Sequence, residues 1–405
     1  MRKGLILTVI LMSLSELVYS QNASWNVTNV ATWIEAVNGI RSGGNNKDHV
    51  ITVTGNISIP SSTENTFGYI TGLTVTITGS GTLSSSNNGA LLQIGAEQTV
   101  IVKDLTLKGR ADNNSSVVCV AKGGTFRMEG NAKVSSNTVF AAFVGEIGGG
   151  GVYVKGNFIM QDMALISGNA INLDLGNMFR NIAGGGGVNV DNDGTFIMRG
   201  NAKVSGNTVL NVFGNEVGGG GVYVRSGTFT MQDNAVVSDN TALIIRYTNR
   251  EGDARGGGVY VRSGTFTMQD NASVWGNTAT FSGGGVYNSG AFNMQSGAIS
   301  SNTTSAKEHS YGGGVYNDGT FTMKGGSIST NTASAYSGTI YAAFAYGGGV
   351  YNYGTFTMQD GKISGNTAVV RSEPSLNHAI GGGVYADGYN NRGVFTMQGG
   401  ELLQN

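Results

Sequence analysis

The 405-residue sequence has very little cysteine, proline and charge, and each shortage excludes a class of protein. Its single cysteine, Cys119, rules out an intrachain disulfide framework. Because Cys119 lies in a Val-Val-Cys-Val run, we expect a small buried apolar residue with an unreactive thiol. Only Pro60 and Pro374 accompany 67 glycines, which is unlike collagen or a disordered linker. With 12% charged residues and a net charge of −1, the composition argues against nucleic acid as a partner.

Groups that could carry out chemistry are also scarce. The three histidines, His49, His309 and His378, fall at positions that the repeat described below is expected to keep far apart. No Ser/His/Asp or Cys/His arrangement and no metal-ligand spacing can be assembled around them. The sequence therefore predicts no catalytic, cofactor-binding or metal-binding residues, and no cofactor.

The first twenty residues are typical of an export signal. Arg2 and Lys3 supply positive charge, residues 4–14 form an apolar run, and Val18 and Ser20 fit the −3 and −1 positions of a cleavage site. The apolar run is too short to span a bilayer. We expect a signal peptide over residues 1–20 and a protein that is secreted or held at a bacterial cell surface or outer membrane; a buried N-terminal strand is the alternative.

Internal repetition dominates the rest of the chain. A Phe-x-Met pair recurs at Met-to-Met spacings from 26 residues (Met268 to Met294) to 39 (Met358 to Met397). The alternation of Phe, Thr and Met has a period of two, which is typical of strands. The nine pairs are Phe126/Met128, Phe158/Met160, Phe196/Met198, Phe229/Met231, Phe266/Met268, Phe292/Met294, Phe321/Met323, Phe356/Met358 and Phe395/Met397.

Each unit is predicted to hold three short strands, for example 259–261 after a glycine run, 265–269, and 274–278. Glycine, asparagine and aspartate pairs separate the second strand from the third, and these residues tolerate the positive φ of sharp corners. Three strands and three corners make one coil of a right-handed parallel β-helix, because parallel crossovers are almost always right-handed. One coil cannot bury its inner face alone, but stacked coils share a continuous core.

Stacking in register predicts internal ladders of Phe, of Met and of Val or Ile. A further ladder of asparagines at one corner would let side-chain amides hydrogen-bond along the axis. The asparagines predicted to form this ladder are Asn137, Asn169, Asn207, Asn240, Asn277, Asn302, Asn331, Asn366 and Asn405.

The corner between the second and third strands is expected to change near residue 290. The distance from Met to the next inward residue is six positions in early units (Met268 to Val274) and five in later ones (Met294 to Ile299), so a residue such as Ala272 is lost.

The repeats occupy residues 117–405, and residues 21–116 are predicted to form a cap and irregular first coils, with a separate small β-domain as the alternative. A helix ending at residues 42–44 would cover the first coil. The apolar face of the predicted helix comprises Val30, Trp33, Ile34, Val37 and Ile40.

No closing segment follows Asn405, so the last coil is expected to offer a strand edge for self-association or for a partner.

Length variation falls between the asparagine corner and the next glycine run, so all insertions are expected on one side of the rod, where loops commonly carry recognition. The insertions span 139–147, 170–183, 243–255, 334–346 and 369–380, and several are aromatic (Phe140, Phe143, Phe179, Tyr247, Tyr341 and Phe344). These side chains either bind a partner or pack on the rod.

A tyrosine column, interrupted by Asn189, is expected to point outward. Its rings could then stack on sugars or anchor a protein partner; the alternative is that they point inward and fill the core. Its members are Tyr153, Tyr223, Tyr260, Tyr287, Tyr316, Tyr351 and Tyr385.

Two columns of charged residues could carry chemistry. A carboxylate beside a cation could serve a lyase or hydrolase that acts on acidic sugars, although a solvated charge ladder is the simpler interpretation. A turn column of aspartates is explained by turn geometry, with a calcium site as the alternative. The first column comprises Lys155, Asp191, Asp193, Arg225 and Arg262, and the second Asp162, Asp233, Asp270 and Asp360.

The Gly-Gly-Gly-Val-Tyr and Ser-Gly-Asn-Thr motifs over residues 117–405 resemble right-handed β-helix repeat proteins of bacterial surfaces with the pectate-lyase-like fold. They are also similar to a variant of the polymorphic outer-membrane protein repeats, whose Phe-x-x-Asn motif is not present here in that form. The resemblance implies an adhesin or autotransporter-passenger role, or a polysaccharide lyase or hydrolase. Fold analogy does not choose between them.

We therefore predict a non-enzymatic, adhesin-like scaffold that binds a surface protein or a glycan through loops on one side. A polysaccharide lyase or hydrolase of the β-helix class is the second hypothesis, and a self-associating structural rod is the third.

The export signal gives the first testable expectation. Protein recovered outside the producing cell should begin at Gln21, because cleavage is expected after Ser20. Edman sequencing or intact-mass measurement would show this. Mature extracellular protein that still carries Met1 would contradict the assignment.

Overall fold

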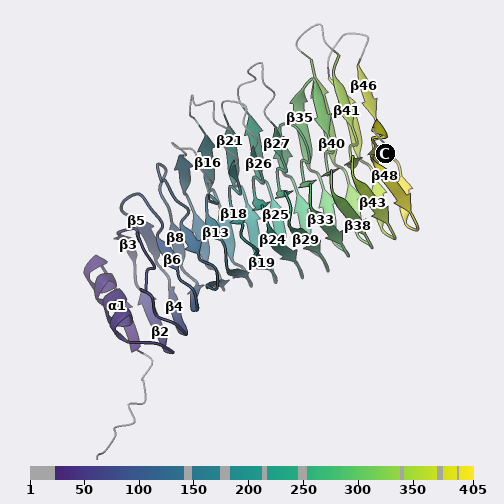
Figure 1. Ribbon diagram of the computed structural model, residues 1–405. Coiled ribbons are helices and arrows are strands. Elements are labelled where there is room, and N and C mark those ends of the chain that lie inside the picture. Colours follow the sequence, from purple (N-terminus) through teal and green to yellow (C-terminus); the bar gives the residue numbers. More distant parts are fainter. Residues whose placement is uncertain are drawn as a thin grey trace, which may run out of the picture.

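The computed structural model describes residues 23–140, 148–173, 183–211, 217–244, 253–337, 342–371, 377–389 and 392–405, so the predicted signal peptide lies outside it. In these ranges the chain forms an all-β parallel β-helix with one helix at its N-terminal end (Figure 1). Four stacked sheets, here A, B, E and D, form the coils. A further sheet, F, flanks the variable corner, which is the stretch between the asparagine corner and the next glycine run where the insertions occur. Within the described ranges, no helix has the length and apolar character that a membrane crossing requires.

Sheet A carries the Phe-x-Met segments, and all nine pairs lie in register on adjacent parallel strands. Neighbouring Phe rings stack with centroids 4.4–5.1 Å apart and planes 5–22° apart, which confirms the predicted Phe ladder. The same sheet begins before the repeats, so residues 23–116 extend one continuous stack. Its strands are β1 (Ala23–Val27), β2 (Asp48–Val53), β4 (Leu73–Gly79), β7 (Gln98–Lys103), β10 (Thr125–Glu129), β14 (Asn157–Met160), β19 (Gly194–Met198), β24 (Gly227–Met231), β29 (Thr265–Met268), β33 (Ala291–Met294), β38 (Thr320–Met323), β43 (Thr355–Met358) and β48 (Val394–Met397).

Sheet B follows sheet A in each coil and carries the inward Val and Ile residues. Its strands are β3 (Asn56–Ile59), β5 (Thr82–Ser85), β8 (Thr106–Lys108), β11 (Lys133–Ser135), β15 (Leu165–Ser167), β20 (Lys203–Ser205), β25 (Val236–Ser238), β30 (Ser273–Trp275), β34 (Ala298–Ser300), β39 (Ser327–Ser329), β44 (Lys362–Ser364) and β49 (Glu401–Leu403).

Sheet E lies beyond the asparagine corner, so the predicted third strand of each repeat is in fact two strands. In one coil Gly276, with φ of +65°, and Asn277 turn the chain sharply between β30 and β31. The sequence pattern missed this because a corner of two residues hardly interrupts the strand-like composition. The strands of sheet E are β12 (Thr138–Phe140), β16 (Ala170–Leu173), β21 (Thr208–Asn211), β26 (Thr241–Ile244), β31 (Thr278–Ala279), β35 (Thr303–Lys307), β40 (Thr332–Tyr336) and β45 (Thr367–Val370).

Sheets D and F complete the coils. Sheet D carries the Val-Tyr segments in β6 (Leu92–Ile94), β9 (Val118–Val120), β13 (Val152–Val154), β18 (Val188–Val190), β23 (Val222–Val224), β28 (Val259–Val261), β32 (Val286–Asn288), β37 (Val315–Asn317), β42 (Val350–Asn352) and β47 (Val384–Ala386). Sheet F has two three-stranded parts, β17 (Ala183–Gly184), β22 (Val217–Gly218) and β27 (Ala254–Arg255), then β36 (His309–Tyr311), β41 (Phe344–Tyr346) and β46 (His378–Ile380). Single bridges through Ser282 join the two parts.

The predicted insertions start from sheet E, and all but the first return through sheet F. These strands follow one long edge of the rod (Figure 1). Parts of the insertions, residues 141–147, 174–182, 245–252, 338–341 and 372–376, lie outside the described residues, and with them Phe143, Phe179, Tyr247 and Tyr341. Their described flanks are paired strands rather than loops, because each insertion continues the coil-to-coil pairing on both sides.

The predicted asparagine ladder forms from Asn169 to Asn405, along the buried corner between sheets B and E. The prediction was wrong for the side chain of Asn137, because its Nδ2 donates to the Ser115 and Gly150 carbonyls and only its backbone N–H bonds to Asn169 Oδ1. The amide Nδ2 of Asn277 donates to Asn302 Oδ1 at 2.9 Å and to the Val237 carbonyl at 3.1 Å. Its Oδ1 accepts from both the backbone N–H and the Nδ2 of Asn240 at 3.0 Å. The same Nδ2-to-Oδ1 bond of 2.9–3.0 Å repeats from Asn169 through to Asn405. Buried amides are thereby satisfied, as low-dielectric surroundings require.

The glycine runs pack against this corner in the next coil. Gly256 has φ of +62°, and a Cβ on Gly257 would lie 2.4 Å from the Thr278 carbonyl oxygen. A Cβ on Gly258 would approach the Asn277 amide nitrogen to 2.9 Å. The runs are therefore glycine because neighbouring backbones meet there, which leaves no room for a side chain.

The corner between sheets A and B changes near residue 290, as predicted. Ala272 is fully buried in the longer turn, and the shorter turn places Gly297, with φ of +93°, where a Cβ would lie 2.4 Å from the Ala272 carbonyl oxygen. A second asparagine ladder, which was not predicted, lies in the same half of the rod. Asn288, Asn317 and Asn352 replace the inward Val or Ile that ends each earlier sheet D strand, and each of the first two donates to the next at 2.7 Å.

The capping helix, α1 (Val30–Ser42), lies at the N-terminal end of the rod (Figure 1). Asn29 caps it and Thr32 returns a hydrogen bond, which together satisfy backbone N–H groups of the first turn. Trp33, Val37 and Ile40 are buried as predicted. The prediction was wrong for the other two members of the face, because Val30 is 42% and Ile34 45% exposed while Ala36 takes the buried position.

Removing one ladder amide tests how strongly the corner holds the coils together. Asn277→Ala would remove the acceptor of the Asn240 backbone N–H, one of the two acceptors of its Nδ2, and the side-chain donor to the Val237 carbonyl, so the free energy of unfolding should fall by about 2–4 kcal/mol. Urea unfolding followed by circular dichroism measures this. Asn271→Ala, at an exposed turn of the same coil, is the matched control and should change stability by less than about 0.5 kcal/mol. Equal effects at the two positions would contradict the role of the ladder.

Candidate binding surface at the variable corner

The tyrosine column lies on the outer face of sheet D, opposite to the inward valines. Val222 and Val224 belong to the main core, whereas Tyr223 belongs to a separate aromatic cluster with Tyr260 and Tyr287. The predicted direction is therefore right, but the predicted exposure is wrong for much of the column. Tyr223 and Tyr260 are each only 2% exposed.

Residues of sheet F cover these rings from the preceding coil. A Cβ on Gly184 would lie 2.3 Å from the Tyr223 ring, and one on Gly218 would lie 2.1 Å from the Tyr260 ring. The Arg255 guanidinium is centred 4.9 Å from the centroid of the Tyr287 ring, a cation–π contact. Sequence alone could not reveal this burial, because the covering residue lies more than thirty positions before its tyrosine.

Toward the C-terminal end the covering residues become aromatic themselves. Tyr311 meets Tyr351 edge-on with centroids 4.9 Å apart, and Tyr346 lies 4.8 Å from Tyr385. Tyrosine therefore covers tyrosine over these two coils, and the aromatic column of sheet D is joined to one of sheet F.

A further row lies beside these pairs on sheet F. Phe344 is stacked between His309 and His378 on adjacent strands, with ring centroids 5.3 and 5.5 Å away. The prediction that His309 and His378 lie far apart was wrong, because the parallel register of β36, β41 and β46 puts them two coils apart in one column. We name His309, Tyr311, Phe344, Tyr346 and His378 the aromatic surface.

Small residues support this surface from behind. After β35 the chain reverses at Glu308, with φ of +72°, so that β36 packs against β35 and β40. Ser310 Oγ donates to Thr304 Oγ1 at 2.7 Å. The alanines of the neighbouring coil, Ala335 and Ala345, are fully buried in the same layer. Because the strands alternate, the rings of sheet F point away from this thin packed layer.

The ring orientation limits what the surface can bind. The planes of His309, Phe344 and His378 are 14° and 9° apart, and those of Tyr311 and Tyr346 are 13° apart. Neighbouring rings therefore cover one another's faces and leave mainly edges and hydroxyl groups for a partner. Stacking of a sugar on a ring face, one of the two expected uses of the tyrosines, is disfavoured by this geometry.

Burial and neighbouring charges raise the pKa values of several tyrosines of sheet D. Burial raises the pKa of Tyr287 to about 12, although the nearby Arg255 charge opposes the shift. Burial also raises the pKa of Tyr316 and of Tyr351. The Tyr351 hydroxyl donates to Asp387 Oδ2 at 2.6 Å, which further favours its protonated form. These side chains act as neutral hydrogen-bonding groups at physiological pH.

The first charged column is confirmed as a column, with Asp191 at its centre. Tyr153 Oη donates to Asp191 Oδ2 at 3.0 Å, Arg225 Nη1 donates to it at 3.1 Å, and Lys155 lies over the Tyr153 ring. Burial raises the pKa of Asp191, but hydrogen bonds from the Asn192 N–H and Tyr153 and the Arg225 charge outweigh it, so the pKa is lowered. Asp191 is thus held ionised by structural partners. Asp193 lies in the same turn with φ of +61°, and Arg262 follows Arg225 one coil later.

The second column is explained by turn geometry. Asp162, Asp233 and Asp270 have φ of 54–58°, and their carboxylates accept backbone N–H groups from the preceding coil at 2.8–3.0 Å. Asp360 accepts from the N–H of Gly361. Among the described residues, no three His, Cys, Asp or Glu side chains come together in a way that could hold a metal ion.

Cys119 and His49 take positions that the sequence did not indicate. Cys119 lies in the tyrosine column of sheet D, opposite Tyr153, and is half-buried on the outer face rather than in the core. Burial raises the pKa of its thiol. His49 is buried on β2 beside the end of α1, where burial lowers its pKa.

The aromatic surface was not singled out, although its sequence carries a signal. The segments His-Ser-Tyr, Phe-Ala-Tyr and His-Ala-Ile each precede a glycine run and alternate a large ring or Ile with a small residue.

Comparison of the chain with protein-family models, with curated proteins and with solved structures finds no match.

The raised pKa of Tyr287 predicts a pH dependence of stability. The unfolded chain ionises this tyrosine near pH 10 and the folded chain near pH 12, so its contribution of about 2–3 kcal/mol is present below pH 10 and is lost as the pH rises to 12. Urea unfolding at pH 9 to 12 measures the loss. Tyr287→Phe should flatten this dependence, whereas Tyr69→Phe, at a well-exposed site, should not. An unchanged slope in Tyr287→Phe would contradict the assignment.

Proposed function

We propose that the protein is a secreted or cell-surface scaffold without catalytic activity, adhesin-like, which binds a partner protein through the aromatic surface. We also infer that it belongs with the pectate-lyase-like β-helix proteins of bacterial surfaces. The export signal, the Gly-Gly-Gly-Val-Tyr repeats and the coil-to-coil asparagine ladder support this placement.

One observation carries the binding proposal. His309, Phe344 and His378 form a row of partly exposed rings on a sheet that extends beyond the coils. Isolated exposed apolar residues are ordinary, but a contiguous group is typical of an interaction site. Aromatic side chains also dominate the energetics of protein interfaces.

Two further features support a protein partner over a glycan. The ring faces are covered by neighbouring rings, so edges and tyrosine hydroxyls remain for contact. The rings are held on paired strands, so little conformational entropy would be lost on binding.

A lyase or hydrolase acting on acidic polysaccharides is the second candidate, and the observation that favours it is the buried Asp191 beside Arg225. Both groups are engaged with each other and Asp191 also with Tyr153, so a reaction would have to break those contacts. The scaffold proposal needs no such rearrangement.

The scaffold proposal is tested by removing the outer row of rings. The labelled full chain should bind members of an array of extracellular matrix and cell-surface proteins. His309→Ala/Phe344→Ala/His378→Ala should weaken that binding by about 30-fold or more, as expected for loss of interface hot spots. Trp275→Ala removes an exposed ring (42%) from sheet B, away from the aromatic surface, and should leave binding unchanged.

Circular dichroism would establish that both variants keep the fold. Binding that survives in the triple variant would contradict the proposed surface. Release of unsaturated uronides from pectin or another uronan would favour the enzymatic candidate, and concentration-dependent assembly without partner binding would favour a self-associating rod.

A further inference from the structure

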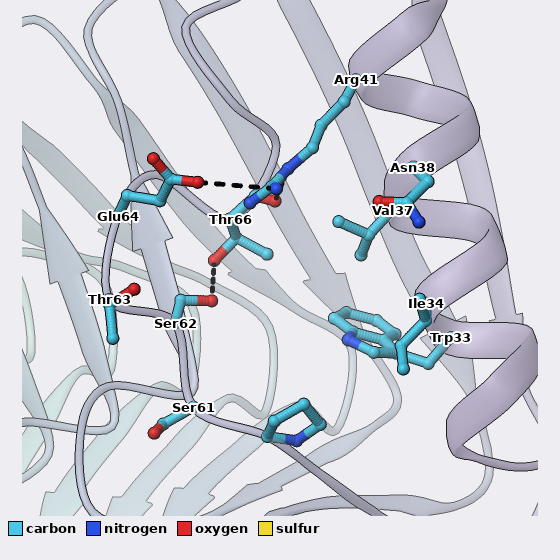
Figure 2. Close-up of a pocket in the computed structure, with 11 residues that line it drawn as sticks. Trp33, Ile34, Val37, Asn38, Arg41, Ser61, Ser62, Thr63, Glu64 and Thr66 are labelled. Atoms are coloured by element: carbon cyan, nitrogen blue, oxygen red, sulfur yellow. Dashed lines mark hydrogen bonds and ion pairs between the residues drawn. The ribbon is translucent and has the colours of Figure 1, made fainter.

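A separate site lies at the N-terminal end of the rod, between α1 and the segment of residues 60–66 that leaves β3. The two elements line an open cavity of about 260 Å³ (Figure 2). Trp33, Ile34 and Val37 of α1, together with Pro60, give it an apolar wall. Ile34 was expected on the buried face of the helix, yet it is 45% exposed at this cavity.

The other lining groups are polar and nearly neutral in sum. Arg41 Nε donates to the Thr66 carbonyl at 3.1 Å, and Nη2 donates to the Asn65 carbonyl at 3.2 Å. The remaining nitrogen, Nη1, lies 3.6 Å from Glu64 Oε1 (Figure 2). The ion pair cancels the charge at the cavity, so neither an anion nor a cation is favoured there.

Several polar atoms of the lining are available to a ligand. Within the described residues, no hydrogen bond engages the Asn38 side-chain amide or the Thr63 hydroxyl, and the second carboxylate oxygen of Glu64 is likewise unengaged. The cavity thus offers an amide beside the apolar residues of α1, and a hydroxyl and a carboxylate oxygen on the facing loop.

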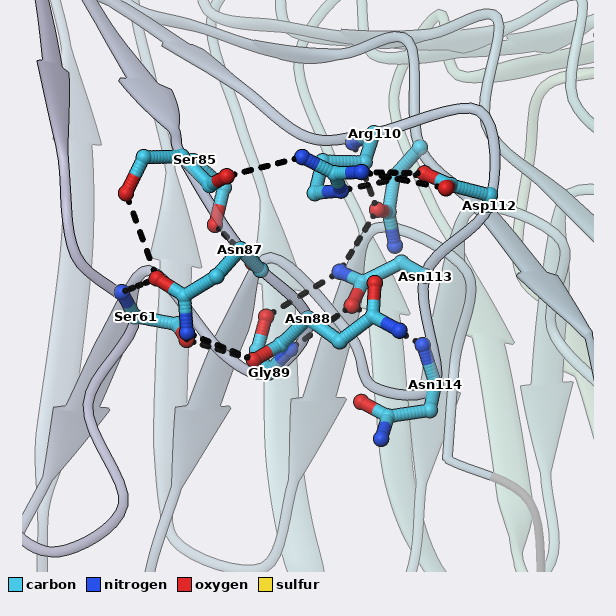
Figure 3. Close-up of polar contacts among 11 residues, drawn as sticks. Ser61, Ser85, Asn87, Asn88, Gly89, Arg110, Asp112, Asn113 and Asn114 are labelled. Carbon is cyan, nitrogen blue, oxygen red and sulfur yellow. Dashed lines mark hydrogen bonds and ion pairs between the residues drawn. The ribbon is translucent and has the colours of Figure 1, made fainter.

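The loop wall of the cavity is held rigidly by a polar network (Figure 3). The Ser61 N–H donates to Asn87 Oδ1 at 3.0 Å, and Asn87 Nδ2 donates back to Ser61 Oγ at 2.7 Å. Ser61 Oγ also donates to the Asn88 carbonyl at 2.6 Å. This network continues into the rod, because Asn113 bonds to both backbone groups of Gly89 and donates to Asn137 Oδ1 at 2.9 Å.

We propose that this cavity binds one neutral sugar ring, such as the terminal pyranose of a glycan. A pyranose combines an apolar C–H face with equatorial hydroxyls, which matches an apolar wall bordered by an amide on α1 and faced by a hydroxyl and a carboxylate on the loop. The cavity is smaller than the roughly 300–1,000 Å³ typical of drug-sized ligands, which suits a single ring. The loop wall needs little reordering, which lowers the entropic cost of binding. This proposal does not rest on the function proposed above, since no residue of the aromatic surface takes part.

Saturation-transfer NMR and calorimetry on the full chain test the proposal with glucose, galactose, mannose, N-acetylglucosamine and glucuronate as probes. At least one neutral sugar should bind with a Kd of about 1–10 mM, as expected for a small open site. Asn38→Ala/Thr63→Ala should raise that Kd at least about tenfold without lowering the melting temperature, because both side chains are exposed and take no part in the fold.

Glu64→Gln supplies a readout that a purely structural role would not move. It leaves Arg41 without its carboxylate partner, so affinity for glucuronate should rise relative to that for the neutral sugars. The triple variant of the aromatic surface should bind sugar like the unmodified protein, so failure of one proposal does not imply failure of the other. No sugar binding at about 20 mM, or equal binding by Asn38→Ala/Thr63→Ala, would overturn the proposal.

Discussion

Register between coils is the constraint on which the rest of the structure depends. Strands in the middle of the rod find backbone partners in the coil before and the coil after, so a slip in one coil would misplace each ladder at once. The asparagine corner fixes this register, because Asn277 can bond both to Val237 behind it and to Asn302 ahead of it only when three coils are aligned. The glycine run that packs beside this corner allows the coils to approach closely.

The sequence predicts the contacts that equivalent residues of successive units make with one another. Residues that repeat within a unit, such as Phe266, Met268 and Asn277, meet their own equivalents in the next coil, so their contacts follow from periodicity alone. The change of corner near residue 290 was also predictable, because it alters a count of residues. The second asparagine ladder could have been found in the same way, from the recurrence of Val-Tyr-Asn.

Contacts between different positions of adjacent coils were not predictable in that way. The burial of Tyr260 depends on Gly218, and that of Tyr351 on Tyr311, and each covering residue comes from a segment whose length varies. The stacking of His309 and His378 on Phe344 depends on the register of sheet F, which no fixed spacing in the sequence encodes. The cavity beside α1 could not be predicted from the repeat either, because Ile34 and Glu64 belong to elements that occur once in the chain.

The asparagine ladder also has an electrical consequence. From Asn169 to Asn405 each amide accepts from the preceding coil through Oδ1, and from Asn169 to Asn366 each donates to the following coil through Nδ2. The amides therefore form one hydrogen-bonded chain with a common direction, in which each bond polarises its neighbours. Such a chain carries a net dipole along the rod, as aligned peptide units do in a helix. A coil in the middle of the ladder is thus held more strongly than an isolated pair of coils would be.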